Sequence, residues 1–116
     1  MAKAYNTNVV VIDGNLAKDP QTRSAGSKTV CSFTVAVNQG EDVSFIDCEA
    51  WEKLGENVSK YCKKGSGVIV TGRIKQGSYD TDSGKRYFVK VVANSVRFIG
   101  GKQEQPTYPD QAYDFE

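Results

Sequence analysis

The pattern of hydrophobic and polar residues predicts three strands in the first half of the chain, the first from a β-branched run that is broken at Asp13-Gly14 and the other two from alternation with a period of two. The segments are residues 8–16, 29–38 and 43–52. Turn-forming sequences separate them, namely Asp19-Pro20, residues 25–27 and residues 39–42. The alternation is clearest in the second segment, where one face would carry Cys31, Phe33, Val35 and Val37.

The period changes after the third predicted strand. Apolar residues then recur at positions i, i+4, i+7 and i+8, which form one stripe of a helix, namely Leu54, Val58, Tyr61 and Cys62. Lys63 and Lys64 would lie in the last turn of this helix, with Gly65 as its C-cap.

Alternation returns after the predicted helix. Residues 68–74 and 87–91 indicate two further strands, separated by a strong turn signal at residues 80–84, and Val96 and Phe98 close the folded body. Three strands, one helix and two strands is the order of the OB-fold, a five-stranded Greek-key β-barrel with a helix between its third and fourth strands. We therefore expect an all-β OB-fold domain over residues 1–100 and a disordered acidic C-terminal tail over residues 101–116.

Composition limits the chemistry that such a domain can perform. The chain has three cysteines, no histidine and no Cys-x-x-Cys pair, so it has too few ligands for a zinc site. We expect Cys31, Cys48 and Cys62 to be reduced and either buried or half-buried, and we expect no metal and no cofactor. The absence of histidine also removes the commonest general base, which argues against most hydrolase and transferase chemistry and for a protein that is not an enzyme.

The net charge of +1 conceals an asymmetry along the chain. Residues 103–116 carry four acids and no bases, and removing those four from the chain's 14 leaves 10 acids against 15 bases, a net charge of +5. A basic body with an acidic tail suggests a polyanionic partner, although an ordinary solvated surface would give the same balance. The apolar run at residues 9–12 is too short for a signal peptide or a membrane span, so we expect a cytoplasmic location.

The strand predicted at residues 43–52 is the most informative segment. One of its faces would carry Ile46, Cys48 and Ala50, which are apolar and suit a core. The other face would carry Phe45, Asp47, Glu49 and Trp51. Two aromatic rings on a polar face indicate a platform on which a flat group can stack.

The same alternation of side-chain direction predicts which residues of the last two strands lie on this face. It adds cations and rings on the side opposite the apolar positions, namely Arg73, Lys75, Tyr79, Arg86, Phe88 and Lys90. Single-stranded nucleic acid requires this mixture, because cations follow the phosphates and rings stack on unpaired bases. For Tyr79 and Phe88 an alternative stays open, in which the two rings only pack across a hairpin.

Several motifs resemble those of bacterial and phage single-stranded DNA-binding proteins. The first lies at residues 14–23, Gly-Asn-Leu-Ala-Lys-Asp-Pro-Gln-Thr-Arg, and the second at residues 33–38, Phe-Thr-Val-Ala-Val-Asn. The others follow in the family's order, at residues 51–58, 61–66, 72–74, Tyr79 and residues 91–98. Each motif alone is weak, but the combination, which runs from residue 8 to residue 99, is highly specific.

The resemblance implies an OB-fold that assembles as a homotetramer and binds single-stranded DNA without strong sequence preference during replication, recombination and repair. It implies a location with the nucleoid, or in the host cytoplasm if a phage encodes the protein. The stacking positions that it implies are Phe45, Trp51 and Tyr79, to which parity adds Phe88. The phosphate-contacting positions are Arg23, Lys53, Lys64, Arg73 and Arg86, to which parity adds Lys75 and Lys90. Residues 8–12 would offer the tetramer a strand edge for pairing.

The chain departs from the family pattern in three places. The turn at residues 39–42 is short and lacks an aromatic residue that is usual in this loop. Asp47 and Glu49 stand where neutral or basic side chains are usual, and they would repel phosphates unless Arg73 or another cation pairs with them. The tail lacks the family's Pro-Phe ending. It is therefore either a reduced docking peptide for replication and repair proteins or a plain disordered end, and its candidate residues are Asp110, Asp114, Phe115 and Glu116.

Two other functions stay open from the sequence. Asp47 and Glu49 could hold Mg²⁺ in a metal-dependent nuclease, although they lack a third ligand and an evident base. Alternatively, the domain could be an OB-fold accessory adaptor in replication or recombination that binds protein partners as well as nucleic acid, which the acidic tail would suit.

Overall fold

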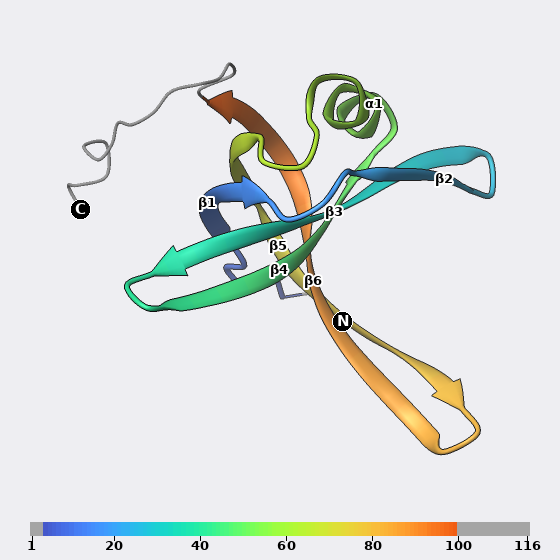
Figure 1. Cartoon of the computed structure of the whole chain (residues 1–116). Coiled ribbons are helices and arrows are strands. Elements are labelled where there is room, and N and C mark those ends of the chain that lie inside the picture. Colours follow the sequence, from blue (N-terminus) through green and yellow to red (C-terminus); the bar gives the residue numbers. More distant parts are fainter. Residues whose placement is uncertain (1–3, 100–116) are drawn as a thin grey trace.

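A computed structural model describes residues 4–99 of the chain (Figure 1). Six strands and one helix follow one another along the sequence, namely β1 (Val10–Leu16), β2 (Gln21–Ala25), β3 (Lys28–Gln39), β4 (Asp42–Trp51), α1 (Glu52–Tyr61), β5 (Gly67–Thr81) and β6 (Gly84–Ile99). The tail predicted at residues 101–116 lies outside the described residues.

Five of the strands close into a barrel. Hydrogen bonds link them in the order β1, β5, β6, β4 and β3, and β1 also pairs with β3, where Asn15 lies opposite Ala36 and Leu16 opposite Val35. These pairings are antiparallel except that of β4 with β6, which is parallel and short. The closed barrel, with α1 between its third and fourth strands, confirms the predicted OB-fold.

The barrel interior is filled by apolar faces that the alternation predicted. Cys31, Phe33 and Val35 of β3 are at most 2% exposed. They pack with inward side chains from the other strands and from α1, including Leu16, Cys48, Ala50, Val58, Val68, Val70 and Val91. Because inward apolar positions alternate with outward polar ones on these strands, the period of two in the sequence becomes the inside and the outside of the barrel.

The three cysteines are free thiols within this core, which confirms their predicted burial. Burial raises the pKa of the Cys48 thiol to about 12, with a smaller contribution from the negative charge of Asp47. Burial likewise raises the pKa of Cys62 to about 11. These thiols therefore stay protonated at neutral pH and serve as small apolar side chains.

One strand was not predicted from the sequence. Residues 21–25 form β2, a hairpin partner of β3 whose pairing runs from Gln21 opposite Ser32 to Ala25 opposite Lys28. Four of its five side chains are exposed, so its sequence carries no apolar alternation that could reveal a strand.

The helix is shorter than predicted. It ends at Tyr61, so its last turn contains Lys60, and Lys63 and Lys64 lie beyond it. Gly65 is not the C-cap, although it adopts a φ of 93° in the turn that follows. Tyr61 points away from the core and is 61% exposed. With only ten residues in α1, the described residues contain no helix long and apolar enough to cross a membrane.

The hairpin of β5 and β6 extends beyond the barrel (Figure 1). β1 pairs with β5 only as far as Gly72, and β4 pairs with β6 over only two residues. Within residues 4–99 no other strand pairs with the hairpin beyond these positions, and Ile74, Tyr87 and Val89 are 48%, 67% and 57% exposed. The expectation that these residues lie on a buried side is therefore wrong, although the alternation correctly predicted which residues share one side of the hairpin.

Gly55 allows α1 to approach the end of β4. A Cβ atom at this position would collide with the backbone carbonyl of Ala50 and crowd Cβ of Cys31. Glycine in a helix normally costs about 1 kcal/mol relative to alanine. Its presence here is therefore explained by close packing between the helix and the barrel.

We expect Gly55→Ala to lower the free energy of unfolding by about 1–3 kcal/mol, because overpacking outweighs the gain in helix propensity. Urea unfolding followed by circular dichroism measures the change. Ser59→Ala, at an exposed position of α1, is the matched control and should stay within about 0.5 kcal/mol of the parent. A more stable Gly55→Ala variant would contradict the close contact.

Candidate nucleic-acid interface

The outer face of the barrel brings the predicted site residues into register across several strands. Cross-strand partners in a sheet lie side by side on the same face. One row crosses the whole face and contains Gln21, Ser32, Glu49, Val92 and Arg73. A neighbouring row contains Arg23, Val30 and Trp51. Residues predicted on separate strands are therefore neighbours in space.

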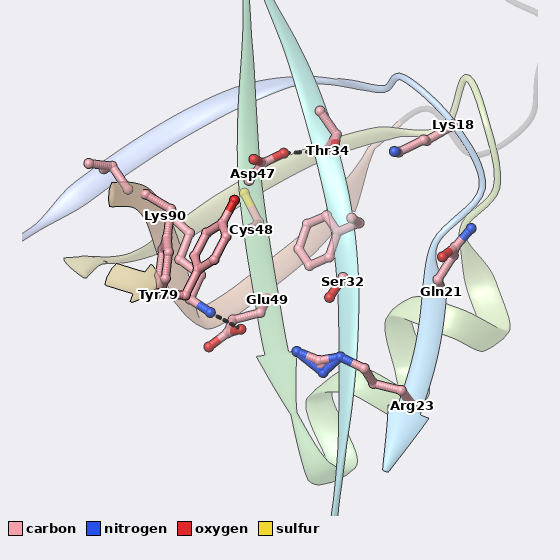
Figure 2. A pocket seen from close by; sticks show the side chains of 13 residues that line it. Lys18, Gln21, Arg23, Ser32, Thr34, Asp47, Cys48, Glu49, Tyr79 and Lys90 are labelled. Atoms are coloured by element: carbon pink, nitrogen blue, oxygen red, sulfur yellow. Dashed lines mark hydrogen bonds and ion pairs between the residues drawn. The ribbon is translucent and has the colours of Figure 1, made fainter. Parts of the chain in front are cut away.

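A groove of about 370 Å³ lies on this face (Figure 2). Side chains from the β1–β2 connection, β2, β3, β4, β5 and β6 line it, and four of them were predicted as site residues, namely Arg23, Tyr79, Phe88 and Lys90. In Figure 2, Arg23 extends from β2 on one side of β4, and Tyr79 and Lys90 lie on the other side. The groove thus presents cations and aromatic rings along one continuous surface.

The aromatic part of the groove belongs to the β5–β6 hairpin. The rings of Tyr79 and Phe88 stack with centroids 6.4 Å apart and an interplanar angle of 29°. Phe88 covers Gly77, where a Cβ atom would overlap the phenyl ring. Tyr79 nevertheless remains 55% exposed. The two rings do pack across the hairpin, and this packing leaves a large part of Tyr79 accessible.

Glu49 lies on the same face as these rings but is only 3% exposed. Its Oε1 accepts a hydrogen bond from Trp51 Nε1 at 3.0 Å, and its Oε2 accepts one from Lys90 Nζ at 2.8 Å. Burial by itself raises the pKa of this carboxyl group. The hydrogen bonds from Lys90 and Trp51, together with the positive charges of Lys90 and Lys75, outweigh burial and lower the pKa below its ordinary value of 4.5. The cation that pairs with Glu49 is therefore Lys90, and not Arg73.

Asp47 differs from Glu49 because its side chain is exposed and its Oδ1 accepts a hydrogen bond from Thr34 Oγ1 at 3.1 Å. Both oxygens of Glu49 are already hydrogen-bonded within the protein, so the two carboxylates do not form an open pair for a divalent ion. Across residues 4–99, no three or more His, Cys, Asp or Glu side chains are grouped in a way that could hold a metal.

Trp51 lies where β4 turns into α1. The next residue, Glu52, has a φ of 55°, which is rare for a residue with a side chain and marks a sharp backbone corner. The corner and the bond to Glu49 together orient the half-buried indole. Phe45, toward the other end of β4, is 62% exposed. The strand thus offers one constrained aromatic ring and one open one.

The other predicted cations are exposed but do not line the groove, and they are Lys53, Lys64, Arg73, Lys75 and Arg86. Lys53 lies in the first turn of α1, and Lys64 lies after the helix, where its backbone N–H donates to Asp19 Oδ1 at 2.8 Å. Lys75 and Arg86 lie opposite Lys90 and Tyr79 in the hairpin. Positive charge therefore extends from the groove onto the hairpin. The predicted docking residues Asp110, Asp114, Phe115 and Glu116 lie outside the described part of the chain.

The groove also contains polar residues that were not predicted from the sequence, namely Lys18, Gln21, Ser32 and Thr34. The alternation of β3 could have found Ser32 and Thr34, because they occupy the outward positions between Cys31, Phe33 and Val35. Lys18 and Gln21 had no such signal, because β2 was not recognised as a strand.

Known proteins of one family are similar to this chain. Residues 7–99 match the single-strand binding protein family. The single-stranded DNA-binding protein of Halalkalibacterium halodurans is 44% identical over 107 residues, which cover 84% of this chain and 64% of the relative. Single-stranded DNA-binding protein 3 of Listeria innocua is 43% identical over 105 residues, which cover 83% of this chain and 66% of the relative. The chain thus spans slightly less than two thirds of the length of these relatives.

The lowered pKa of Glu49 predicts a pH-dependent stability. A carboxyl group with a lower pKa in the folded state stabilises the fold above its ordinary pKa of 4.5, and this stabilisation is lost as the pH falls through the folded-state value. Between about pH 6 and about pH 3 we expect the free energy of unfolding to decrease more in the parent than in Glu49→Gln, whose amide does not titrate. Urea unfolding at each pH tests this, and equal decreases in the two proteins would contradict it.

Proposed function

The chain belongs to the single-strand binding protein family, and we propose that it binds single-stranded DNA without strong sequence preference. The observation that carries this proposal is the groove on the outer barrel face, where aromatic rings and cations lie side by side. Bases of any kind have a face that can stack on a ring, and phosphates are attracted to lysine and arginine. Binding through these two features depends little on sequence.

In this proposal each class of side chain has one role. The stacking residues are Phe45, Trp51, Tyr79 and Phe88, and the large exposed fractions of Phe45 and Tyr79 support it. The phosphate contacts are Arg23, Lys53, Lys64, Arg73, Lys75 and Arg86, all of which are exposed. Lys90 differs from these cations, because its ammonium group is only 2.8 Å from a carboxylate oxygen of Glu49.

The cellular role that we propose is to coat and protect exposed strands during replication, recombination and repair. This role places the protein in the cytoplasm with the nucleoid, or in the host cytoplasm if a phage encodes it. The acidic tail, residues 101–116, would then dock replication and repair proteins. A pull-down of such proteins with the full chain but not with a chain ending at residue 100 would support docking, and equal recovery would exclude it.

Trp51 is the only tryptophan in the chain, so its fluorescence reports directly on the proposed stacking. We expect oligo-dT to quench this fluorescence, and the affinity to fall steeply with salt because bound phosphates release counterions. We expect Trp51→Ala to weaken binding of fluorescently labelled oligo-dT, measured by anisotropy, by about 1–3 kcal/mol. Tyr61→Ala, at an exposed aromatic residue on α1 outside the groove, is the control and should bind like the parent. Unchanged fluorescence at low salt would exclude the proposed function.

We further propose that the chain assembles as a homotetramer. The support is the first strand, which pairs with β5 through residues 10–15 but with β3 only at Asn15 and Leu16. Within residues 4–99 its second edge is therefore unpaired from Val10 to Gly14, and the nearby Val9 and Val11 are 67% and 63% exposed. An unpaired edge with apolar neighbours favours pairing with another chain.

Light scattering should give four times the subunit mass of 12.7 kDa. We expect Val11→Asp to shift the protein toward smaller species, because a charge at the edge opposes strand pairing between chains. Asp13→Asn, at an exposed position of the same strand, is the control and should keep the parent mass. A single 12.7 kDa species for the parent would refute the tetramer.

A further inference from the structure

Among residues 4–99, Glu49 is the only polar or charged residue that is buried. A buried carboxylate is costly unless it is paired and hydrogen-bonded. A carboxylate on this face also opposes the phosphates of a bound strand. Two unfavourable effects thus meet at one position, and the contacts of Glu49 show what compensates for them.

The contacts of Glu49 link the two aromatic parts of the interface. One carboxylate oxygen holds the indole nitrogen of Trp51 at 3.0 Å, and the other holds the ammonium group of Lys90 at 2.8 Å. The same ammonium group lies 4.9 Å from the ring centroid of Phe88, which stacks on Tyr79. Glu49 is therefore the central member of a continuous chain of contacts from β4 to the hairpin.

This arrangement changes what the outer members of the chain of contacts can do. The indole N–H is the only hydrogen-bonding group of the Trp51 side chain, and it donates to Glu49. The indole therefore has no polar group left to read a base edge. Lys90 is only 24% exposed at its side chain, and its charge is compensated by Glu49. Lys75, its exposed cross-strand neighbour, has no carboxylate within ion-pair distance among the described residues.

We propose that Glu49 is a positioning residue of the DNA-binding face. It holds the edge of the Trp51 indole, so that only the face of the ring is available to a base. It also holds Lys90 beside Phe88, so that Lys90 supports this ring and does not contact a phosphate. This inference rests on the proposed function, because it assigns roles within the same site. It makes stacking by Trp51 independent of base identity. It also removes Lys90 from the set of cations that release counterions on binding.

The charge of Glu49 can be tested apart from its hydrogen bonds. Glu49→Gln keeps an acceptor oxygen for Trp51 but loses the charge that compensates Lys90. The slope of log affinity for oligo-dT against log salt should then steepen by about 0.7, the value for one additional phosphate contact on a single strand. Adding Lys90→Met to Glu49→Gln should return the slope to the parent value. Glu56→Gln removes an exposed acid from α1, changes the net charge equally, and should leave the slope unchanged.

The hydrogen bond to Trp51 is tested with Glu49→Met, which keeps the side-chain volume but removes the acceptor. In the free protein, acrylamide should quench Trp51 more strongly in Glu49→Met than in the parent, whereas Glu49→Gln should match the parent. At high salt, where phosphate contacts contribute little, Glu49→Met should bind oligo-dT about 3- to 10-fold more weakly than the parent. Circular dichroism confirms that each variant is folded, and Glu49→Gln keeps the test valid if Glu49→Met does not fold.

The outcomes separate this inference from the proposed function. If the parent does not bind oligo-dT, both fail. If the parent binds and Glu49→Gln has the parent's salt slope, or if Lys90→Met does not reverse the steeper slope, only the role of Glu49 is overturned. Equal quenching by acrylamide in Glu49→Met and the parent would likewise refute the positioning of Trp51.

Discussion

The short parallel pairing between β4 and β6 is the constraint on which the rest of the interface depends. It sets Cys48 beside Val91 and Glu49 beside Val92. On the inner side, Cys48 and Val91 are each only 3% exposed, so burial of apolar surface holds the register. On the outer side, the same register brings Lys90 within 2.8 Å of Glu49. A slip of one residue would exchange these two sides and would separate the carboxylate from its cation.

Core packing and the proposed binding surface are therefore two faces of one set of strands. Trp51 ends a barrel strand, whereas Phe88 lies on a hairpin that leaves the barrel, and the Glu49–Lys90 ion pair connects them. Such an ion pair is a weak source of stability, because desolvation of both charges offsets their attraction. In the proposed function the ion pair contributes by fixing side chains before binding, because side chains that are already fixed lose less entropy when a ligand binds.

Sequence reasoning succeeded where structure follows from local periodicity. The alternation in residues 29–38 predicted the buried face of β3, and the change of period predicted the helix around Val58. It missed β2, whose side chains are mostly exposed and therefore show no pattern. It also placed Tyr87 and Val89 on a buried side, because parity tells which residues share a face but not where the barrel ends.

The sequence by itself determined the OB-fold order of elements, the identity of the core strands and the presence of aromatic residues and cations on one face. It also marked Glu49 as an anomaly, because a carboxylate on such a face opposes a polyanion. Only the tertiary structure decided that Glu49 is buried, that Lys90 is its partner and that Trp51 donates to it. The physical reason is that alternation is set by neighbouring residues, whereas the pairing of charges depends on the register of strands far apart in the sequence.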